Sequence, residues 1–296
     1  MKSKGIWLVV GLLRLFAFES GAAPGEPLRV LYMEATGDQE IFHLKHALEE
    51  DPGIHVTALF YDQRGNAGSA RNEIVYLDQR NGDKVYRVQH SRHGYPKTFE
   101  ALLRYDVIIC SDVAKAAFSD EQMSNTVRFV EEHGRGFVMI GGQTSFGAGY
   151  YDQTPLQKII PVQMANSRDN VDARFEAVVA FGALEHPICK LSDQSDENRA
   201  AWERLPPFFG FNRVDSAKPG ATTLWQHPSD RAQNGPRPLL VIQQIGKGRC
   251  MAFMSDTTAA WGRSFEHDWG EGASHYKRFW VNAVRWLAAG RNPPGH

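Results

Sequence analysis

The sequence predicts an α/β fold, in which a mostly parallel sheet has helices on both faces and gains an antiparallel strand extension in the second half. Three observations lead to this prediction. A strand–helix–strand pattern near the start of the chain is typical of a parallel pair joined by a right-handed crossover. Two short runs, 107–110 and 137–140, are apolar without interruption, and the second is typical of a strand buried on both faces. After Pro161, predicted strands follow one another without full helices between them.

The first half alternates strands and helices. Its predicted strands cover residues 28–33, 54–60, 106–110 and 137–140, and a helical pattern separates the first two. Residues 61–97 interrupt the alternation with Gly, Asn, Arg and His, and we interpret them as an excursion that carries a small hairpin. A short helix is predicted over 98–104. The best-defined helix begins at Ser119, because a Ser N-cap with Gln122 three residues later forms a capping box, and it ends at Gly134.

The second half begins with a short helix that has Thr154-Pro155 at its start, and then adds strands. These strands cover residues 178–181, 221–226, 238–245 and 249–255. Gly246-Lys247-Gly248 is a hairpin turn between the last two. A closing helix over 274–288 has aromatic and aliphatic side chains at helical spacing, which gives it one buried face. We expect residues 23–296 to form a single domain.

The first 22 residues are predicted to be a signal peptide. Lys2 and Lys4 precede an apolar stretch from Ile6 to Phe18, and small residues follow, with cleavage after Ala22. Removal of this segment changes the 33 basic and 34 acidic residues to 30 and 33, a net charge of −3. We therefore expect a periplasmic or secreted protein. It should have no stable transmembrane anchor after cleavage and no basic surface for nucleic acid.

The three cysteines, Cys110, Cys189 and Cys250, all lie in apolar surroundings. An odd number spread this widely is not typical of a disulfide framework, even in an exported protein. The sequence therefore predicts buried free thiols.

The turn after the strand at 137–140 is the most informative local feature. Paired glycines let the backbone adopt positive φ and let another group approach closely. Polar residues also follow other predicted strands, and carboxyl strand ends in an open α/β sheet converge on one crevice. We therefore predict one shared ligand-binding pocket lined by Glu34, Gly141, Gly142, Gln143, Ser145 and Asp256. The alternative interpretation of the glycine pair is a tight structural turn.

Six segments, in the same order along the chain, are similar to segments of a known protein family. They are residues 105–113, 136–147, 154–156, 160–162, 185–188 and 255–257. Together they resemble the putative glutamine amidotransferase-like domain of the class I glutamine amidotransferase-like superfamily. The resemblance spans about residues 28–290 and implies a flavodoxin-like parallel sheet for the whole domain.

The catalytic part of this resemblance is incomplete. Class I amidotransferases use a Cys on a sharp turn after a strand, backed by a His and a Glu. The comparable turn here, residues 141–143, has no thiol, and Ile188 stands after His186-Pro187 where the carboxylate belongs. We therefore expect no glutaminase activity. The chain is interpreted as a non-catalytic binding or scaffold module for an unknown small molecule or protein partner, with no cofactor.

A hydrolase acting on a small amide, ester or sugar-derived substrate is the alternative. Ser145 would be its nucleophile and His186 its base, although Ser145 lacks a G-x-S-x-G setting. The segment 265–271, with His275 beyond it, has enough oxygen and nitrogen donors for a metal ion. No tight repeat such as H-E-x-x-H fixes those donors on one face, so we predict a solvated loop and no metal site.

Overall fold

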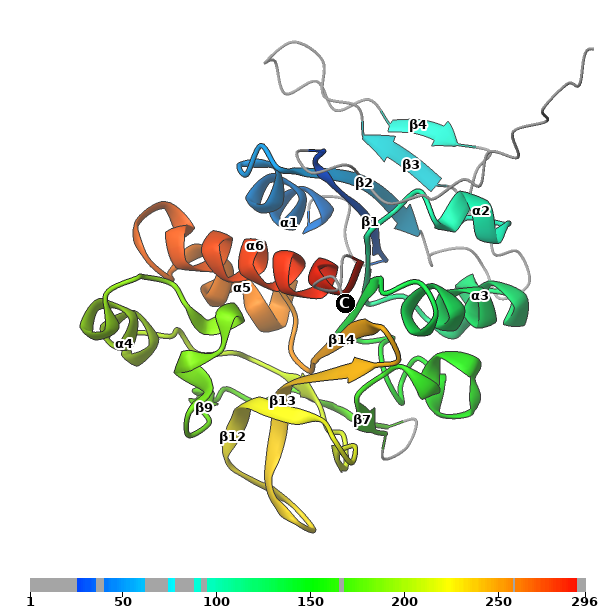
Figure 1. Ribbon diagram of the computed structural model, residues 1–296. Helices are drawn as coiled ribbons and strands as arrows, with labels where there is room; N and C mark the ends of the chain where they lie inside the picture. The colour runs from blue at the N-terminus through cyan, green and yellow to red at the C-terminus, as the bar shows by residue number, and fades with distance from the viewer. Residues whose placement is uncertain are drawn as a thin grey trace, which may run out of the picture.

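One mixed sheet of ten strands forms the centre of the molecule, in the order β4-β3-β2-β1-β5-β6-β14-β13-β12-β9 (Figure 1). The computed structural model describes residues 26–35, 40–61, 74–77, 88–91, 95–164, 168–257 and 259–291. The predicted signal peptide lies outside these residues and stays a prediction. Within the described ranges, no helix combines the length and apolar character that a bilayer span needs.

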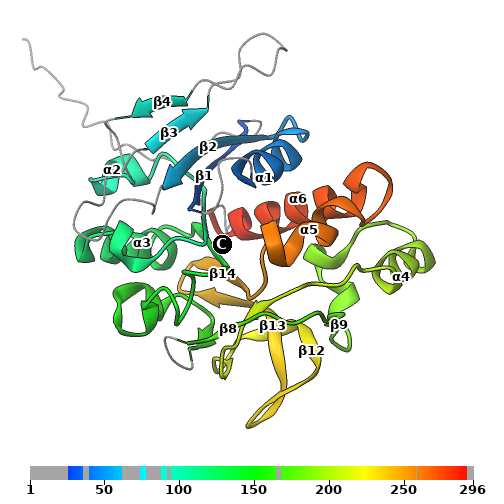
Figure 2. The same ribbon diagram turned by 180° about the vertical axis from the view of Figure 1, so that it is seen from behind.

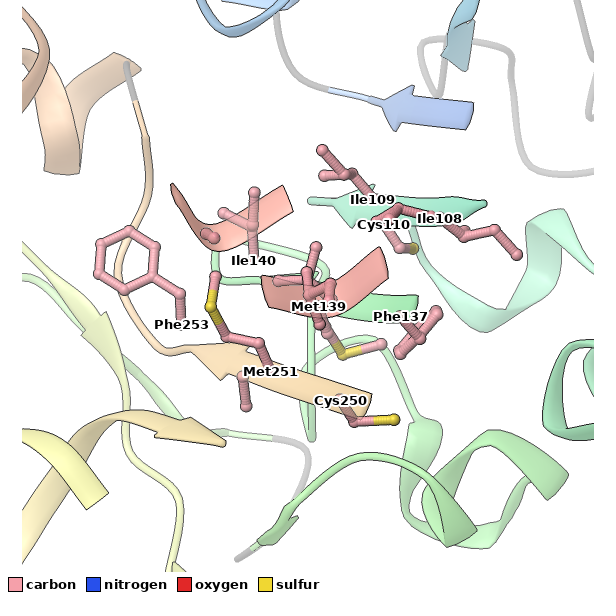
Figure 3. Close-up of a cluster of buried hydrophobic side chains, with 14 of the residues drawn as sticks. Ile108, Ile109, Cys110, Phe137, Met139, Ile140, Cys250, Met251 and Phe253 are labelled. Carbon is pink, nitrogen blue, oxygen red and sulfur yellow. The ribbon is translucent and has the colours of Figure 1, made fainter. Parts of the chain in front are cut away.

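The parallel core consists of β1 (Leu28–Glu34), β2 (Ile54–Tyr61), β5 (Val107–Ser111), β6 (Gly136–Ile140) and β14 (Gly248–Phe253). Every residue of β5 and β6 is buried, because helices cover both faces of these strands. Their side chains belong to one apolar cluster with those of β14, in which Met139 and Met251 are labelled members (Figure 3). The structure thus confirms that the strand at 137–140 is buried on both faces, and the strand predicted at 106–110 is found as β5, which is equally buried.

Antiparallel strands extend the parallel core at both ends. Next to β2 lie β3 (Ile74–Leu77) and β4 (Val88–Ser91), which form the predicted hairpin. Beyond β14 lie β13 (Gly235–Ile245), β12 (Thr222–Ala232) and β9 (Val178–Val179). Ile245 pairs with Gly248, so the predicted turn joins β13 to β14. The fold class is confirmed: a flavodoxin-like α/β sheet with an antiparallel extension in the second half.

Helices cover both faces of this sheet (Figures 1 and 2). One face has α1 (Glu40–Glu49), α5 (Ala259–His267) and α6 (Ser274–Ala288), and the other has α2 (Phe99–Leu102) and α3 (Asp120–Glu131). α3 begins with the predicted capping box. The Gln122 N–H donates to Ser119 Oγ at 3.2 Å, and the Ser119 N–H donates to Gln122 Oε1 at 2.9 Å. α6 begins and ends at the predicted residues.

The prediction that the second half lacks full helices between its strands is wrong. α4 (Ser195–Glu203) lies between β9 and β12, whereas α5 follows the last strand and so does not bear on the prediction. α4 has no side-chain cap at Gln194 and few apolar residues, so its sequence gives little helical signal. It is held by Trp202, whose ring contacts Trp225 at 5.3 Å and Trp269 at 4.9 Å between centroids. Burial of aromatic side chains, rather than periodicity, fixes this helix.

Short elements connect the longer ones. Two small antiparallel pairs are β7 (Val162–Gln163) with β11 (Ser216–Ala217) and β8 (Asn170–Val171) with β10 (Phe211–Asn212). The 3₁₀ helices are η1 (Lys115–Ala117), η2 (Tyr151–Gln153), η3 (Pro155–Lys158), η4 (Ala183–Glu185), η5 (Pro187–Cys189), η6 (Glu271–Ala273) and η7 (Ala289–Arg291). The predicted short helix at Thr154-Pro155 is therefore η3, with Thr154 as its N-cap.

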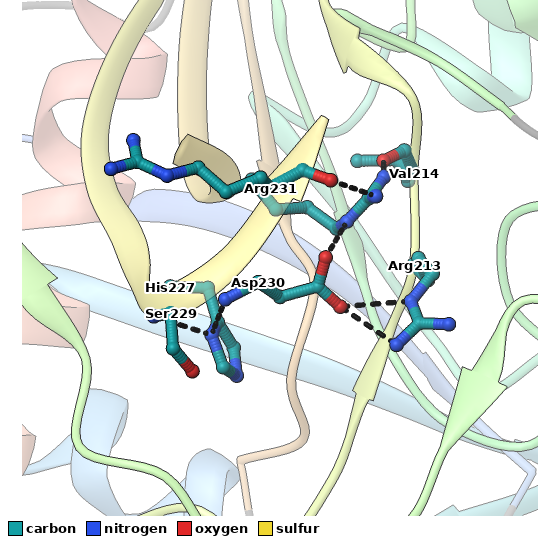
Figure 4. Close-up of polar contacts among 7 residues, drawn as sticks. Arg213, Val214, His227, Ser229, Asp230 and Arg231 are labelled. Carbon is teal, nitrogen blue, oxygen red and sulfur yellow. Dashed lines mark hydrogen bonds and ion pairs between the residues drawn. The ribbon is translucent and has the colours of Figure 1, made fainter. Parts of the chain in front are cut away.

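An ion network holds the distal part of the β12–β13 hairpin (Figure 4). The pairing of these strands shifts register between Gln226 and Arg231, so the backbone is irregular there. Asp230 lies in this irregular stretch and accepts hydrogen bonds from Arg213 Nε at 2.9 Å and from Arg237 Nε at 2.7 Å. Arg237 Nη2 also donates to the Arg231 carbonyl at 2.7 Å. This side-chain hydrogen bond gives a partner to a backbone group in the stretch where the regular pairing of the strands is interrupted.

Candidate functional site

The carboxyl ends of four parallel strands meet along one edge of the sheet. Glu34 of β1 pairs with Ser111 of β5, and Ser111 pairs in turn with Ile140 of β6. Ile140 pairs with Phe253 at the end of β14. The loops that follow these strands therefore leave the sheet side by side. Each residue predicted to bind a ligand ends one of these strands or lies in the loop after it: Glu34, Gly141, Gly142, Gln143, Ser145 and Asp256.

Gly141 and Gly142 form a tight turn against the buried side chain of Asn212. Gly142 has a φ of +148°, and a Cβ atom added there would lie 2.5 Å from Cγ of Asp112. Asn212 Oδ1 accepts a hydrogen bond from the Gly142 N–H at 3.0 Å, and its Nδ2 donates to the Gly142 carbonyl at 3.1 Å. Glycine is needed at this position because no side chain fits between these groups.

Ser145 is held by hydrogen bonds to the backbone on both sides of it. Its Oγ donates to the Ile140 carbonyl at 2.6 Å and accepts from the Asp112 N–H at 3.1 Å. Asp112 has a positive φ of 49° and accepts hydrogen bonds from the N–H and the hydroxyl of Thr144. The Ser145 hydroxyl is fully buried in this network, so it shapes the turn instead of facing a crevice.

Asp169 and Asn170, which the sequence prediction missed, hold the rest of the turn. Asp169 accepts hydrogen bonds from the backbone N–H groups of Gly147 at 2.8 Å and Ala148 at 3.1 Å. Burial raises the pKa of the Asp169 carboxyl, although hydrogen bonds to the carboxylate oppose that shift. Asn170 Nδ2 donates to the carbonyl of Gln143 at 3.0 Å and to its side-chain oxygen at 3.2 Å. Gln143 is exposed to solvent.

The pairing of Ser145 with His186 as nucleophile and base is wrong. The His186 ring contacts that of Trp286, in the last turn of α6, at 5.3 Å between centroids. Burial lowers the pKa of His186, and the charge of Arg249 lowers it further. Arg249 pairs with Gly136 at the amino end of β6. Ser145 follows the carboxyl end of β6. The two side chains therefore lie at opposite edges of the sheet.

A second group of side chains forms what we call the acidic corner: Tyr32, Glu34, Ser111, Asp256, Thr257 and Tyr276. Glu34 is fully buried, and its carboxylate accepts from the Tyr32 hydroxyl at 2.8 Å and from the Ala35 N–H at 2.9 Å. Asp256 accepts from the Thr257 N–H at 2.6 Å. Burial raises the pKa of Tyr32, and the charges of Glu34 and Asp256 raise it further. Glu34 and Asp256 both follow strands that end at this edge of the sheet, and both influence the ionisation of Tyr32, so we group them in one corner.

Three hydroxyls of the acidic corner make no hydrogen bond within the part of the chain that the structure describes. They belong to Ser111, Thr257 and Tyr276, each of which is at most 1% exposed. Tyr276 faces Thr257 without meeting hydrogen-bond geometry. Burial raises the pKa of Tyr276, and the Glu266, Asp256 and Glu34 carboxylates raise it further. The sequence did contain a signal for Tyr276, because a tyrosine on the apolar face of a helix brings a hydroxyl into the core.

The three cysteines are buried and free, as predicted. Burial raises the pKa of Cys110 to about 12 and that of Cys189 to about 12, and burial also raises the pKa of Cys250. A thiol with such a pKa stays protonated at neutral pH and is a poor nucleophile.

The segment 265–271, predicted to be a solvated loop, begins as the last turn of α5 and is packed only in part, since His267, Asp268 and Glu271 are exposed. Phe265 lies in α5 and Trp269 follows it, and both side chains are fully buried. His267 Nε2 contacts Glu266 Oε2 at 2.8 Å, and Glu266 Oε1 contacts His43 Nδ1 of α1 at 2.6 Å. Glu266 therefore joins α5 to α1 beside the acidic corner.

Comparisons with known proteins agree with this fold. The sequence model of a family described as putative glutamine amidotransferase matches residues 69–289. The structure of cytoplasmic protein STM3548 from Salmonella typhimurium is similar, with a TM-score of 0.62, 21% identity, and coverage of 88% of this chain and 99% of that chain. Cytoplasmic protein STM1381 from Salmonella typhimurium LT2 gives a TM-score of 0.60, 20% identity, and the same two coverages. No curated protein sequence matches the chain.

Proposed function

Because the chain belongs to the putative glutamine amidotransferase family, we propose that it acts as a non-catalytic binding or scaffold module that holds a small polar molecule at the acidic corner. The observation that supports this most is the set of three buried hydroxyls without hydrogen-bond partners in the described residues. A buried polar group without a partner costs about 1–3 kcal/mol. Water or a ligand usually satisfies groups of this kind.

The chemistry of the acidic corner defines the class of ligand. The carboxylates of Glu34 and Asp256 are hydrogen-bond acceptors, and the hydroxyls of Ser111, Thr257 and Tyr276 can donate or accept. A ligand that presents several O–H or N–H groups, such as a polyol or an amine, suits this set. An anionic ligand does not, because it would be repelled by the two carboxylates.

The hydrolase alternative has less support. The turn at 141–143 has no thiol, the Cys110 pKa is raised to about 12 by burial, and the Ser145 hydroxyl donates to a backbone carbonyl. An enzyme at the acidic corner would have to use the two carboxylates instead, as general acid and base. Release of ammonia from glutamine by the purified protein, lost on substitution of Glu34 or Asp256, would favour the enzyme over the binding module.

The binding proposal is tested by thermal shift with sorbitol, glucosamine and glutamine as probes. A probe at a hundred times its dissociation constant should stabilise the protein by roughly 2.7 kcal/mol. We expect Tyr276→Phe and Thr257→Val to weaken binding at least tenfold, because each removes one of the hydroxyls. Tyr150→Phe is the control, since Tyr150 is 58% exposed. Equal affinity in all variants, or no shift with any probe, would reject the acidic corner as the binding site.

The proposal includes export. The sequence of residues 1–22 supports removal of a signal peptide and residence in the periplasm or outside the cell. N-terminal sequencing of the protein from its native host should begin near Ala23. An intact Met1 in the cytoplasmic fraction would reject export.

A further inference from the structure

A separate cavity of about 480 Å³, widely open to solvent, lies beside α3, away from the acidic corner. It is formed where η3 and β7 pack beside α3, which covers the face of the sheet opposite α6. Its size is within the range of about 300–1,000 Å³ that is common for small-molecule sites. Its polar side chains include Ser124, Thr154, Gln157, Gln163 and Lys218.

Lys218 is the central charged group of this cavity. Its backbone N–H donates to the Pro161 carbonyl at 3.0 Å, which fixes the position of the residue. The side chain is half-buried, and its ammonium donates to the Gln157 carbonyl. Burial lowers the pKa of Lys218, as is usual for an ammonium removed from water. In the described residues Lys218 makes no ion pair, so a neutral carbonyl is the partner of a charged group.

The other lysine of the cavity is already neutralised. Lys158 Nζ contacts Glu131 Oε2 at 2.7 Å, and Glu131 is the last residue of α3. The remaining polar groups that line the cavity are neutral hydroxyls and amides. The cavity therefore has one positive charge in excess. An ammonium has three N–H donors, and the Gln157 carbonyl accepts one of them.

We propose that this cavity binds a small metabolite through a carboxylate or phosphate group, with the Lys218 ammonium as its counter-ion. The anion takes the two remaining donors of Lys218 and the side-chain amides of Gln157 and Gln163. Val127 and Pro155 form an apolar wall for the rest of the ligand. Charge-assisted hydrogen bonds of this kind are stronger than neutral ones, and they are stronger still in a half-buried site.

The test uses citrate and inorganic phosphate as probes, with binding measured by calorimetry at constant ionic strength so that general screening is equal. We expect saturable binding of at least one probe. Lys218→Met should weaken it at least tenfold, and Lys218→Arg, which keeps the charge, should weaken it less. Lys190→Met is the matched control, because Lys190 is exposed and pairs with Glu185 in another part of the chain.

Two results would overturn this proposal. One is the absence of saturable binding for both probes, and the other is equal affinity in wild type and Lys218→Met. Circular dichroism of each variant shows whether it is folded. If Lys218→Met does not fold, the affinity of Lys218→Arg still tests the proposal. Tyr276→Phe, which tests the acidic corner, should leave citrate and phosphate binding unchanged. The two sites can therefore fail independently.

Discussion

Two neighbouring regions at the carboxyl edge of the sheet use their polar groups in opposite ways. The glycine turn at 141–145 has its polar groups joined to Asp112, Asn170 and Asn212, and the Ser145 hydroxyl both donates and accepts. In the acidic corner, three buried hydroxyls make no hydrogen bond within the described chain. In the most conspicuous motif of the sequence, these polar groups already have partners within the fold, whereas in the less conspicuous corner three buried hydroxyls have hydrogen-bonding capacity that the described chain does not use.

The largest effect expected from this comparison is at Gly142. Gly142→Ala adds a Cβ atom 2.5 Å from Asp112 Cγ at a φ of +148°. Gly235→Ala is the matched control, because Gly235 has a φ of +144° and no atom of the described residues lies within 4 Å of an added Cβ. The backbone strain, about 1–3 kcal/mol, is common to both. Gly142→Ala should lower the free energy of unfolding by about 1–3 kcal/mol more than Gly235→Ala, because of the steric overlap.

Urea denaturation of both variants measures this difference. Equal losses would mean that Asp112 moves aside at little cost. The turn would then not be the rigid element that the comparison requires.

Ser145→Ala is expected to have the next largest effect. It leaves the buried Asp112 N–H without its acceptor and the Ile140 carbonyl without its donor. The loss in unfolding free energy should be about 1–3 kcal/mol. Probe binding at the acidic corner should be unchanged once the variant is folded. Unchanged stability would show that water replaces the hydroxyl. The glycine turn and the acidic corner would then not differ in how firmly their buried hydroxyls are held.

The Asp230 network is a third polar region whose groups have partners, but it lies nearer to solvent than the glycine turn. Burial favours a higher pKa for Asp230, but hydrogen bonds from Arg237 and Arg213 outweigh it and hold the pKa below its ordinary value. A lowered folded-state pKa stabilises the protein above the unfolded-state pKa, and this stabilisation is lost as pH falls through the folded-state pKa.

Asp230→Asn should therefore cost roughly 1 kcal/mol near neutral pH, and the gap from wild type should narrow as the pH falls below about 3.9, the ordinary Asp pKa, towards the lower folded-state pKa. Urea denaturation of wild type and variant at a series of pH values measures this difference in unfolding free energy. Asp193→Asn, at an exposed residue, is the control. A gap that stays constant with pH would show that the carboxylate charge has no part in holding the hairpin.

Much of the fold could be predicted from local patterns. Uninterrupted apolar runs identified β5 and β6, the capping box identified the start of α3, and helical spacing identified α6. These signals lie within a few residues of one another in the chain. The order of the parallel strand ends then places Glu34, Gly142 and Asp256 at one edge. That these residues bind a ligand stays a prediction.

The polar partners could not be predicted in the same way. Asn212 is 70 residues from Gly142 in sequence, and Asp169 is 22 residues from Gly147. No periodicity relates such pairs, because tertiary packing alone brings them together. The same reason explains why α4 was missed, since the burial of Trp202 stabilises it more than its own sequence does. It also explains the wrong pairing of Ser145 with His186, because motif order says nothing about which edge a loop occupies.

The smallest expected effect is at Ser111, and it is the direct counterpart of Ser145. Both residues are serines at most 1% exposed at the same edge of the sheet, and alanine removes only the hydroxyl from each. Ser111 Oγ has no hydrogen-bond partner in the described residues, so its removal leaves no group unsatisfied. Ser111→Ala should therefore change the unfolding free energy by less than about 0.5 kcal/mol, or stabilise the ligand-free protein slightly. Urea denaturation of Ser111→Ala and Ser145→Ala under the same conditions measures the difference between their unfolding free energies. A loss at Ser111 as large as that at Ser145 would mean that water already satisfies the hydroxyl in the free protein, and the acidic corner would then have no unused capacity for a ligand.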